Sequence, residues 1–576
     1  MEKPWLKSYE AGVPASLTYP NTSIWGLLST AFTDYPYHKA LTMTLRYLPL
    51  GLKIGVSFTY RQLEERVERL ATALAGMGVK KGDRVAVQTP NSPGGVIGFL
   101  AATRIGAIVV NTNPTYTPRE MKHQFQDAGA ETIILWNELY PRLQEIQAET
   151  SIKNVVIYNL NDFMGQPFAA LLKRAREKEG TWVDVPEGAG VHQMTRLIAT
   201  HAATPPDVPI DPEDVALFQY TGGTTGLPKA AMLSHRNLVA NILQCSAWLT
   251  DLEPGKEKMM GAIPFFHVFG MTVAMLLGLR TGGEVFVLPN PRDIGFVMEQ
   301  IQREGCTVYP GVPAMYIGII NHPQVAKYNL RSIKVCISGA APLPVEVQKR
   351  FEELTGGRLR EGYGLTEAAP VTHANPIYGH SKAGAIGLPF PDVEARIVSL
   401  DPGPDGKPAP LGVGEEGELA LRGPQVMVGY WNKPEETAKT RDEAGWLYTG
   451  DIAKMDEDGY FYIVDRKKDL IIASGYNIVP REVEEVLFEH PAVQEALVAG
   501  VPDAKRGETV KAYVVLKPGQ TATAEELIAF CRENLAPYKV PKLVEFRSEL
   551  PKSMVGKFLR RVLVEEEKAK LAAQQK

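Results

Sequence analysis

The chain has 576 residues, of which 44% are hydrophobic and 22% are charged. This balance is ordinary for a globular protein and excludes global disorder, and the length suggests roughly four folding units of about 150 residues. The 62 basic residues do not outnumber the 66 acidic ones, and the formal net charge is -4. Proteins held to nucleic acid mainly through phosphates normally carry a basic excess, so no nucleic-acid partner is expected.

Helical and strand patterns alternate through the first two thirds of the chain. Residues 60–77 carry apolar side chains at helical spacing, residues 83–88 are typical of a strand, and residues 95–108 of an apolar helix. Further strands are predicted at 107–110, 132–136, 154–158, 215–218, 283–288, 306–309 and 334–337. The alternation predicts an α/β fold in which helices cover a parallel sheet.

The pattern changes between about residues 384 and 465, where short strands are separated by turns rich in Gly, Pro and Asp. This predicts an antiparallel, β-barrel-like subdomain. The rest of the chain indicates a compact α+β unit, with helices at 481–489 and 523–534 and strands near 494–500 and 511–516. We therefore divide the chain into a large N-terminal domain, 1–466, and a small C-terminal domain, 467–576.

The segment 261–279 is uncharged over 19 residues, which is just the length of a bilayer span. It also contains Pro264, His267, Thr272 and three glycines, and no second segment of this kind accompanies it. A buried core segment or the wall of an apolar pocket is therefore favoured over a transmembrane helix.

The cysteines and the first residues indicate the compartment. Four cysteines, at 245, 306, 336 and 531, form neither a C-x-x-C unit nor a disulfide framework. The opening residues, MEKPWLKSYE, lack the apolar core of a signal peptide. We expect a reducing, cytoplasmic location. Peripheral contact at the inner face of the membrane stays open, because the stretch 41–60 has only Arg46 and Lys53 as charges; a β-rich core segment is the favoured alternative.

The strongest chemical signal is the segment YTGGTTGLPK at residues 220–229. Its glycines let backbone N–H groups converge on an anion, its threonine hydroxyls add donors, and Lys229 adds a positive charge. It follows the predicted strand 215–218 and precedes a helix that Ser234 could cap. The spacing is neither that of a Walker loop nor that of a dinucleotide-binding loop. A phosphate-binding loop is predicted, with a flexible Gly/Thr turn as the alternative.

Three further segments after the predicted phosphate loop give weaker indications of nucleotide chemistry. The segment REGYGLTE at 360–367 sets Tyr363 between two glycines, where its ring could stack on a base. Thr366 and Glu367 in the same segment could serve a phosphoryl oxygen and Mg²⁺, which prefers hard oxygen ligands. Asp451, beyond a tight turn, could accept ribose hydroxyls, and PKSMVGK at 551–557 carries a lysine in a Gly-containing loop. Taken singly, each is also compatible with an ordinary turn or a solvated charge.

Taken together and in this order, the segments resemble the adenylate-forming superfamily of acyl-CoA synthetases, luciferases and peptide-synthetase adenylation domains. The resemblance runs from about residue 55 to 565 and extends to PFFH at 264–267, SGAAPL at 338–343 and GYNI at 475–478. The segment from Gly445 to Asp469 is most similar to bacterial long-chain fatty-acid–CoA ligases. Ala230 stands where the family usually has glycine.

The resemblance implies an AMP-forming acid–thiol ligase with a mobile C-terminal domain. Fatty acid and ATP would give acyl-AMP and pyrophosphate, and coenzyme A would then displace AMP to give acyl-CoA. The substrates would be a fatty acid, ATP and coenzyme A, with Mg²⁺ as cofactor. Medium-chain or aryl acids, or a carrier protein in place of coenzyme A, are the alternatives, and a homodimer stays open.

The resemblance also implies a role for individual residues. The phosphates of ATP would be held by Thr221, Gly222, Gly223, Thr224, Thr225, Gly226 and Lys229. Adenine and ribose would contact Gly339, Ala340, Ala341, Glu361, Gly362, Tyr363, Gly364, Asp451 and Arg466. Mg²⁺ would be held by Glu367 and Thr224. The catalytic residues would be Lys557, bridging carboxylate and α-phosphate, Thr366 at the α-phosphate, and His267 at the acyl end. The coenzyme A side would use Gly475, Tyr476 and Asn477, and Lys468 would be the hinge.

Overall fold

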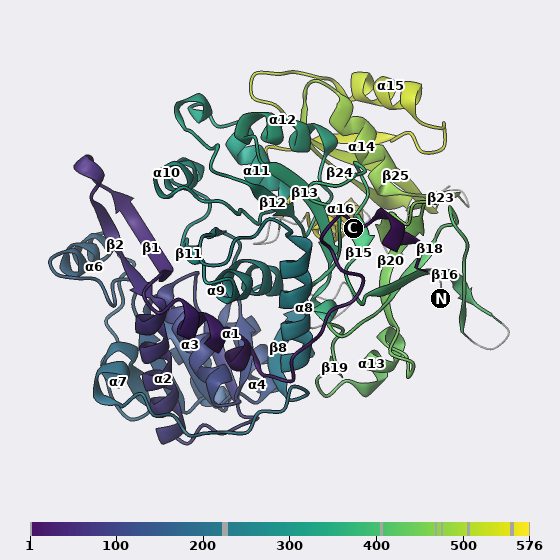
Figure 1. Cartoon of the computed structure of the whole chain (residues 1–576). Helices are drawn as coiled ribbons and strands as arrows, with labels where there is room; N and C mark the ends of the chain where they lie inside the picture. The colour runs from purple at the N-terminus through teal and green to yellow at the C-terminus, as the bar shows by residue number, and fades with distance from the viewer. Residues whose placement is uncertain are drawn as a thin grey trace.

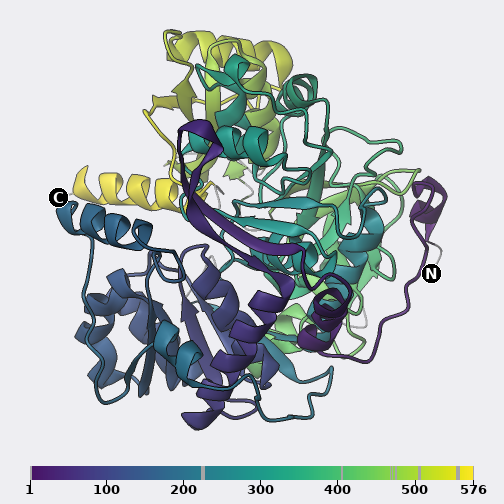
Figure 2. The same ribbon diagram turned by 60° about the vertical axis from the view of Figure 1, so that its left-hand side comes forward.

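The computed structural model describes residues 3–221, 228–403, 407–466, 469, 471–473, 476–503, 507–552 and 558–574. Figure 1 shows the N-terminal half at the lower left, the middle of the chain at the centre, and the C-terminal unit at the upper right. In Figure 2 the two chain ends lie on opposite sides of the molecule.

An eight-stranded sheet forms the centre of the N-terminal half. Its order is β19-β9-β8-β4-β3-β5-β6-β7, and the pairs from β8 to β7 are parallel. The strands are β3 (Arg84–Gln88), β4 (Ile108–Thr112), β5 (Thr132–Trp136), β6 (Asn154–Tyr158), β7 (Val191–Gln193), β8 (Val215–Thr221), β9 (Lys229–Ser234) and β19 (Gly429–Tyr430). The predicted α/β fold with a parallel sheet is confirmed.

Helices cover both faces of this sheet because alternate strand residues point to opposite sides. Val85 and Val87 of β3 belong to the core beneath α2 and α3, whereas Ala86 belongs to the core beneath α4 and α5. The helices of this half are α1 (Ile24–Asp34), α2 (Tyr60–Gly76), α3 (Pro93–Arg104), α4 (Pro118–Ala128), α5 (Tyr140–Ile146), α6 (Phe168–Lys178), α7 (Met194–Thr200) and α8 (His235–Trp248).

Two four-stranded sheets continue the large domain. The first has the order β10-β11-β1-β2 and the second β12-β13-β14-β15. Their strands are β1 (Lys39–Tyr47), β2 (Lys53–Thr59), β10 (Lys258–Gly261), β11 (Glu284–Val287), β12 (Val335–Ser338), β13 (Arg358–Gly364), β14 (Val371–Ala374) and β15 (Leu388–Pro389). The helices around them are α9 (Leu277–Arg280), α10 (Ile294–Glu304), α11 (Pro313–Ile320) and α12 (Val345–Thr355). The strand predicted at 306–309 is reduced to isolated bridges at Val308, which joins Met259 to Val335.

The antiparallel pattern predicted after residue 384 is present as a five-stranded sheet. Its order is β17-β16-β18-β20-β21, and among the described residues the end strands β17 and β21 are not paired with each other. The strands are β16 (Glu394–Pro402), β17 (Pro408–Pro410), β18 (Gly417–Arg422), β20 (Leu447–Met455) and β21 (Phe461–Arg466), accompanied by α13 (Pro434–Thr440). 

The C-terminal unit has its own sheet and its own hydrophobic core. The strands are β22 (Ile471–Ala473), β23 (Tyr476–Ile478), β24 (Val493–Asp503), β25 (Gly507–Leu516) and β26 (Leu543–Phe546). The helices are α14 (Pro480–Glu489), α15 (Ala524–Asn534) and α16 (Arg560–Gln574). Val483, Val498 and Leu527 pack together in the core of this unit. The domain boundary at 466–468 stays a prediction.

The apolar segment 261–279 is largely buried. Its centre is a π-helix, η5 (Gly270–Leu276), that continues into α9, and all seven of its residues are buried. Within the described part of the chain, no helix combines the length and the apolar run that crossing a bilayer requires. The favoured prediction for this segment, a buried core element, agrees with the structure.

The four cysteines are free thiols, and all four are buried. Burial raises the pKa of every one of them, that of Cys531 to about 11. The structure therefore places no cystine among Cys245, Cys306, Cys336 and Cys531.

Helix α8 begins as the sequence predicts. The Ser234 hydroxyl accepts the Asn237 N–H at 3.2 Å, and the Asn237 side chain accepts the Ser234 N–H at 2.9 Å. The Asn237 amide also donates to the carbonyl groups of Pro424 and Val426, both at 2.9 Å. The cap thus holds the chain just before β19 against α8.

The first residue of α8, His235, generates a prediction about acid stability. Its Nδ1 accepts the Ile24 N–H at 3.2 Å, and burial lowers the pKa of the imidazole to about 4. The unfolded chain binds a proton there below about pH 6.5 and the folded chain does not, so the free energy of unfolding falls as the pH drops from 6.5 to 4. The substitution His235→Asn keeps an acceptor for Ile24 but cannot titrate.

We expect His235→Asn to reduce this acid-induced loss by about 3 kcal/mol, which corresponds to the size of the pKa shift. The measurement is urea unfolding by tryptophan fluorescence at pH 7.5, 5.5 and 4.5 for both proteins. The same fall in unfolding free energy for both proteins would contradict the assignment.

Candidate active site

The predicted phosphate loop connects two antiparallel strands. Thr221 at the end of β8 and Lys229 at the start of β9 are register partners, so they face each other across the mouth of a β-hairpin. Gly222, Gly223, Thr224, Thr225 and Gly226 lie outside the described residues. The predicted helix capped by Ser234 does follow the loop, and a strand that the sequence did not predict, β9, lies between the two. The N-terminus of α8 is therefore not the end of the loop.

Lys229 is held by a carboxylate and an aromatic ring. Its Nζ lies 2.8 Å from Glu436 Oε2 on α13 and 4.8 Å from the centre of the Tyr430 ring. Lys439 donates to the other oxygen of Glu436 at 2.8 Å. Hydrogen bonds from Lys229 and Lys439 lower the pKa of Glu436 to about 2, so the carboxylate stays charged at neutral pH. The ammonium group is thus fixed at the hairpin mouth, where an anion would displace or share Glu436.

Tyr430 joins this cation to the predicted metal ligand. Its hydroxyl donates to Glu367 Oε1 at 2.7 Å, while its ring lies beside Lys229. Burial and the nearby Glu367 raise the pKa of the phenol, which therefore stays protonated and donates. The contact exists because β19 pairs with β9, with Tyr430 opposite Ala231, and because Met427 N–H donates to the Glu367 carbonyl at 2.8 Å. No sequence motif indicated a role for Tyr430.

The donor set around Glu367 suits a metal ion that arrives with phosphates. Thr366 and Glu367 lie in the short turn Thr366–Ala368 after β13, and both are half-buried. Among the described residues, no group of three or more His, Cys, Asp or Glu side chains could hold a metal by itself. Mg²⁺ usually takes one or two carboxylates and completes its shell with substrate phosphates and water. Glu367 fits that pattern, and Thr224, the second predicted ligand, lies outside the described residues.

The predicted nucleotide residues gather near the ends of β12 and β13 and beside the middle of β20. Tyr363 at the end of β13 donates its hydroxyl to Asp451 Oδ2 at 2.6 Å, and Asp451 pairs in register with Arg466 of β21. Gly339, Ala340 and Ala341 follow β12, whose last residue pairs with Glu361. The pairs β12–β13 and β20–β21 belong to two sheets, and the Tyr363–Asp451 hydrogen bond joins the predicted adenine and ribose contacts across them.

Two glycines of this set leave no room for a side chain. A Cβ at Gly364 would lie 2.1 Å from the Pro370 carbonyl oxygen, and one at Gly339 would lie 2.9 Å from the Phe269 ring. Gly362 is less constrained, because the nearest atom to its Cβ would be 3.1 Å away. The backbone directly after Tyr363 is therefore packed closely against Pro370.

Glu361 is a predicted nucleotide residue whose carboxyl group is buried. Burial raises its pKa to about 7, against the opposing effects of the Arg481 charge and of the Leu343 backbone N–H. Arg481 belongs to α14 of the C-terminal unit and donates to the Ile463 carbonyl at 2.9 Å. No sequence motif indicated that a charge from the C-terminal unit acts on Glu361.

The predicted acyl end touches both halves of this site. Phe269 packs beneath Gly339, and the Thr272 hydroxyl donates to the Ala369 carbonyl at 3.0 Å. His267 is half-buried and accepts the Phe269 N–H on Nδ1 at 3.2 Å. The start of the apolar segment is therefore in contact with the adenine loop and with the turn that carries Glu367.

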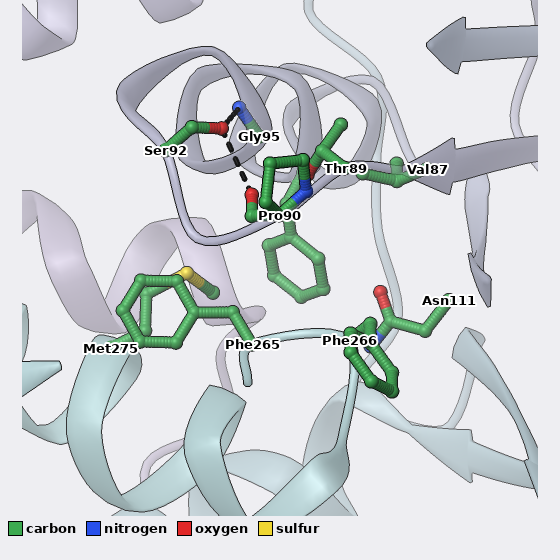
Figure 3. A pocket seen from close by; sticks show the side chains of 10 residues that line it. Val87, Thr89, Pro90, Ser92, Gly95, Asn111, Phe265, Phe266 and Met275 are labelled. Atoms are coloured by element: carbon green, nitrogen blue, oxygen red, sulfur yellow. Dashed lines mark hydrogen bonds between the residues drawn. The ribbon is translucent and has the colours of Figure 1, made fainter. Parts of the chain in front are cut away.

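A narrow cavity opens beside the same segment (Figure 3). Phe265, Phe266 and Met275 line one side. The rest of the lining comes from Val87, Thr89, Pro90, Ser92, Gly95, Phe99 and Asn111. Its walls are mainly apolar, with a few polar groups, which is the usual character of a site for an apolar ligand.

Buried amides fix the backbone of this cavity wall. Asn91 donates to the carbonyls of Gly261 and Ile263, at 3.0 and 2.8 Å, and accepts the Phe265 N–H at 2.7 Å. Gln219 donates to the Phe266 carbonyl at 3.0 Å. Buried side-chain amides thus pair four backbone groups of the bend before η5.

The remaining predicted residues are less fully described. Tyr476 and Asn477 lie in β23, opposite Ala473 and Ile472 of β22. Gly475, Lys468 and Lys557 lie outside the described residues, so their predicted roles at coenzyme A, the hinge and the α-phosphate stay predictions.

Comparison with known proteins identifies the family. A sequence model for the AMP-binding enzyme family matches residues 31–431, and the model for its C-terminal domain matches residues 482–557. The chain belongs to the AMP-binding enzyme family. The resemblance drawn from the motifs is therefore confirmed, and the two matches cover most of this AMP-binding enzyme.

The relatives are similar over their full length. The long-chain-fatty-acid–CoA ligase of Bacillus subtilis (strain 168) is 46% identical over 568 residues, which is 98% of each chain. That of Escherichia coli O157:H7 is 40% identical over 582 residues, 99% of each chain. Among solved structures, ATP-bound MatB from Rhodopseudomonas palustris is 30% identical with a TM-score of 0.81, covering 95% of this AMP-binding enzyme and 99% of that chain.

The contacts of Tyr430 generate a prediction for this AMP-binding enzyme. The substitution Tyr430→Phe keeps the ring beside Lys229 and removes the hydrogen bond to Glu367. A hydrogen bond to a charged group contributes about 1.5–3 kcal/mol, so the rate of adenylate formation should fall about 10- to 100-fold. The measurement is pyrophosphate release as a function of Mg²⁺ concentration, in which Tyr430→Phe should need more Mg²⁺ to reach half its maximal rate.

Tyr462→Phe is the matched control, because Tyr462 donates to a different carboxylate, Asp456, at 3.0 Å. It should leave both the rate and the Mg²⁺ requirement near the wild-type values. Equal effects of the two substitutions would refute a specific role for Tyr430.

Proposed function

We propose that this chain is an AMP-forming long-chain fatty-acid–CoA ligase. In the first half-reaction the fatty-acid carboxylate attacks the α-phosphate of ATP, giving acyl-AMP and pyrophosphate. In the second, the thiol of coenzyme A attacks the acyl carbon and AMP leaves. The full-length similarity to two ligases of this name supports the reaction. The observation that carries the proposal is structural: Tyr430 ties the predicted phosphate-binding lysine to the predicted metal ligand.

Charge explains why the first half-reaction needs this arrangement. The acid and the triphosphate are both anionic, so their approach is favourable only where fixed positive groups and donors surround them. Lys229, held at the mouth of the β8–β9 hairpin, would contact the β- and γ-phosphates together with Thr221 and the loop that follows it. Glu367 and Thr224 would hold Mg²⁺, whose charge offsets that of the phosphates. Lys557 would bridge the carboxylate and the α-phosphate, beside Thr366.

The nucleoside would bind at the end of β13, beside Asp451 in the middle of β20. Tyr363 would present its ring to adenine, with Gly339, Ala340 and Ala341 on the other side. The Tyr363 hydroxyl donates to Asp451 Oδ2 at 2.6 Å and so orients the carboxylate that would accept the ribose hydroxyls. The ribose would thus be held by a carboxylate that is already fixed before the nucleotide arrives.

The acyl chain would enter the cavity beside Phe265, Phe266 and Met275, with His267 at its polar end. Each buried CH₂ group contributes about 0.8 kcal/mol, so an apolar cavity discriminates between acids by chain length. Medium-chain and aryl acids remain the alternative substrates. A cytoplasmic location and a homodimer stay predictions.

The test of the proposed function separates the half-reactions. Purified protein with Mg²⁺, ATP and fatty acids from C6 to C18 should release pyrophosphate without coenzyme A, and should form the thioester once coenzyme A is added. We expect the highest kcat/KM at C14 to C18. An optimum at C8 would contradict the long-chain assignment, and acyl-AMP that passes only to a carrier protein would contradict the acceptor. Absence of any adenylate would refute the proposal.

Two substitutions should impair opposite halves of the reaction. Lys557→Ala removes the bridging ammonium group, at a cost on the order of 3 kcal/mol if it resembles an oxyanion donor, so adenylate formation should fall at least about 100-fold. Lys468→Pro should stiffen the predicted hinge, so the protein should make acyl-AMP and stall before the thioester. Pyrophosphate release measures the first step, and thioester formation from added acyl-AMP measures the second.

Each variant serves as the control for the other. Lys557→Ala should convert added acyl-AMP to thioester at a rate near that of the wild type, and Lys468→Pro should release pyrophosphate in a single turnover. If Lys468→Pro formed thioester unimpaired, the hinge would be wrongly placed.

A further inference from the structure

The hairpin of β1 and β2 extends beyond the sheet to which it belongs. In the described residues, β1 pairs with β11 at Leu41 and Thr42. Beyond Thr42, as far as Tyr47, β1 pairs with β2. Figure 1 shows the hairpin projecting from the left edge of the molecule, with its turn farthest out. The established features of the site do not account for this projection.

The turn of the hairpin carries exposed leucines. Leu50 is 98% exposed, the highest value of any large apolar side chain in the described residues, and Leu52 is 63% exposed. Full exposure of leucine is unfavourable in water, and here two exposed leucines lie within three residues. An apolar group at the tip of a projecting element indicates a contact outside the protein.

The backbone conformation of Leu50 is one that leucine rarely adopts. Leu50 and Gly51 both have positive φ, 61° and 76°, as a type I′ hairpin turn requires at its two central positions. Asn-Gly is the preferred pair there, because asparagine tolerates this conformation and leucine does not. Leu50 therefore occupies a strained position at which a polar residue would make a better turn. A strained residue that packs against nothing points to a role for its side chain.

The residues just below the turn are bound to helix α10. The Tyr47 hydroxyl and the Lys53 ammonium group both donate to Glu304 Oε1 on α10, at 3.0 and 2.7 Å. The Arg303 guanidinium lies 5.0 Å from the Tyr47 ring centre. These contacts fasten the hairpin to α10 immediately below the turn, so that Leu50 and Leu52 are presented on a fixed support.

The charge of the hairpin distinguishes among partners. Residues 39–59 contain no acidic residue, although the chain as a whole has a net charge of -4. Arg46, four residues before Leu50, is exposed. Exposed apolar side chains beside an exposed arginine, on a hairpin that itself carries no acidic residue, suit a bilayer surface that has anionic headgroups above an apolar interior.

We propose that the tip of the β1–β2 hairpin docks on an anionic lipid surface. Leu50 and Leu52 enter the interfacial layer, and Arg46 contacts headgroup phosphates. The inference goes beyond the proposed ligase activity, and its test uses no substrate, so failure of one does not imply failure of the other. Two leucines and one arginine give weak, reversible binding that anionic lipid strengthens and salt weakens.

The first experiment is flotation of the full chain with vesicles of phosphatidylglycerol and phosphatidylcholine, compared with phosphatidylcholine alone. The wild type should float with the anionic vesicles and be released by salt. Leu50→Asn gives the turn its preferred residue, so the thermal midpoint should stay the same or rise. Its partition onto anionic vesicles should nevertheless fall about tenfold or more. Arg46→Gln should lose the preference for anionic lipid.

Val413→Asn is the matched control, because Val413 is 48% exposed in a turn of the antiparallel subdomain, on a different part of the chain. It should float as the wild type does. Equal flotation of wild type and Leu50→Asn, or no flotation of either, would overturn the proposal.

A second experiment separates lipid from a second copy of the chain. The four native thiols are buried, so Leu50→Cys provides a single accessible site for an environment-sensitive fluorophore. A blue shift on adding anionic vesicles supports docking on lipid. A blue shift that depends on protein concentration without lipid would overturn it in favour of self-association, for which the edge strand β2 is available. The same label at Val413→Cys should show neither shift.

Discussion

The site depends on keeping a cation and an anion close together without letting them neutralise each other. Lys229 and Glu367 come from distant parts of the chain, and Tyr430 contacts both of them. Its ring faces the ammonium group, its hydroxyl faces the carboxylate, and Glu436 balances the charge of the lysine. Both groups are therefore oriented before a substrate arrives, which is the condition for electrostatic preorganisation. The short pairing of β19 with β9 maintains this geometry, and the Asn237 contacts hold the chain that enters β19.

Much of the fold could be predicted because buried parallel strands are continuous apolar runs. Residues 132–136 and 154–158 are predicted as strands and form β5 and β6 with those bounds. Residues 306–309 have a similar composition but contribute only the bridges at Val308, because propensity does not determine which backbone groups find partners. The strand β9 could not be predicted, because residues 229–234 have no pronounced apolar pattern. Their pairing with β8 makes them a strand.

The candidate site could be predicted as a set of segments but not as a set of contacts. The family motifs place Tyr363 and Asp451 in the same site, and the structure adds the hydrogen bond between them. Tyr430 lies 63 residues from Glu367 in the sequence, in a strand of two residues whose register leaves no trace in composition. The apolar segment 261–279 is similar: hydropathy alone allows a membrane span, and the buried amides of Asn91 and Gln219 are what make it an interior wall.

The burial of all four cysteines has a consequence for side reactions. An acyl-adenylate is an anhydride that reacts with any accessible thiolate, and the second half-reaction depends on a thiol brought in by the co-substrate. Cys245, Cys306, Cys336 and Cys531 are inside the protein, and their raised pKa values keep them protonated at neutral pH. The protein thus has no nucleophilic sulfur of its own to compete for the activated acyl group, and self-acylation at cysteine is suppressed by the packing of the core.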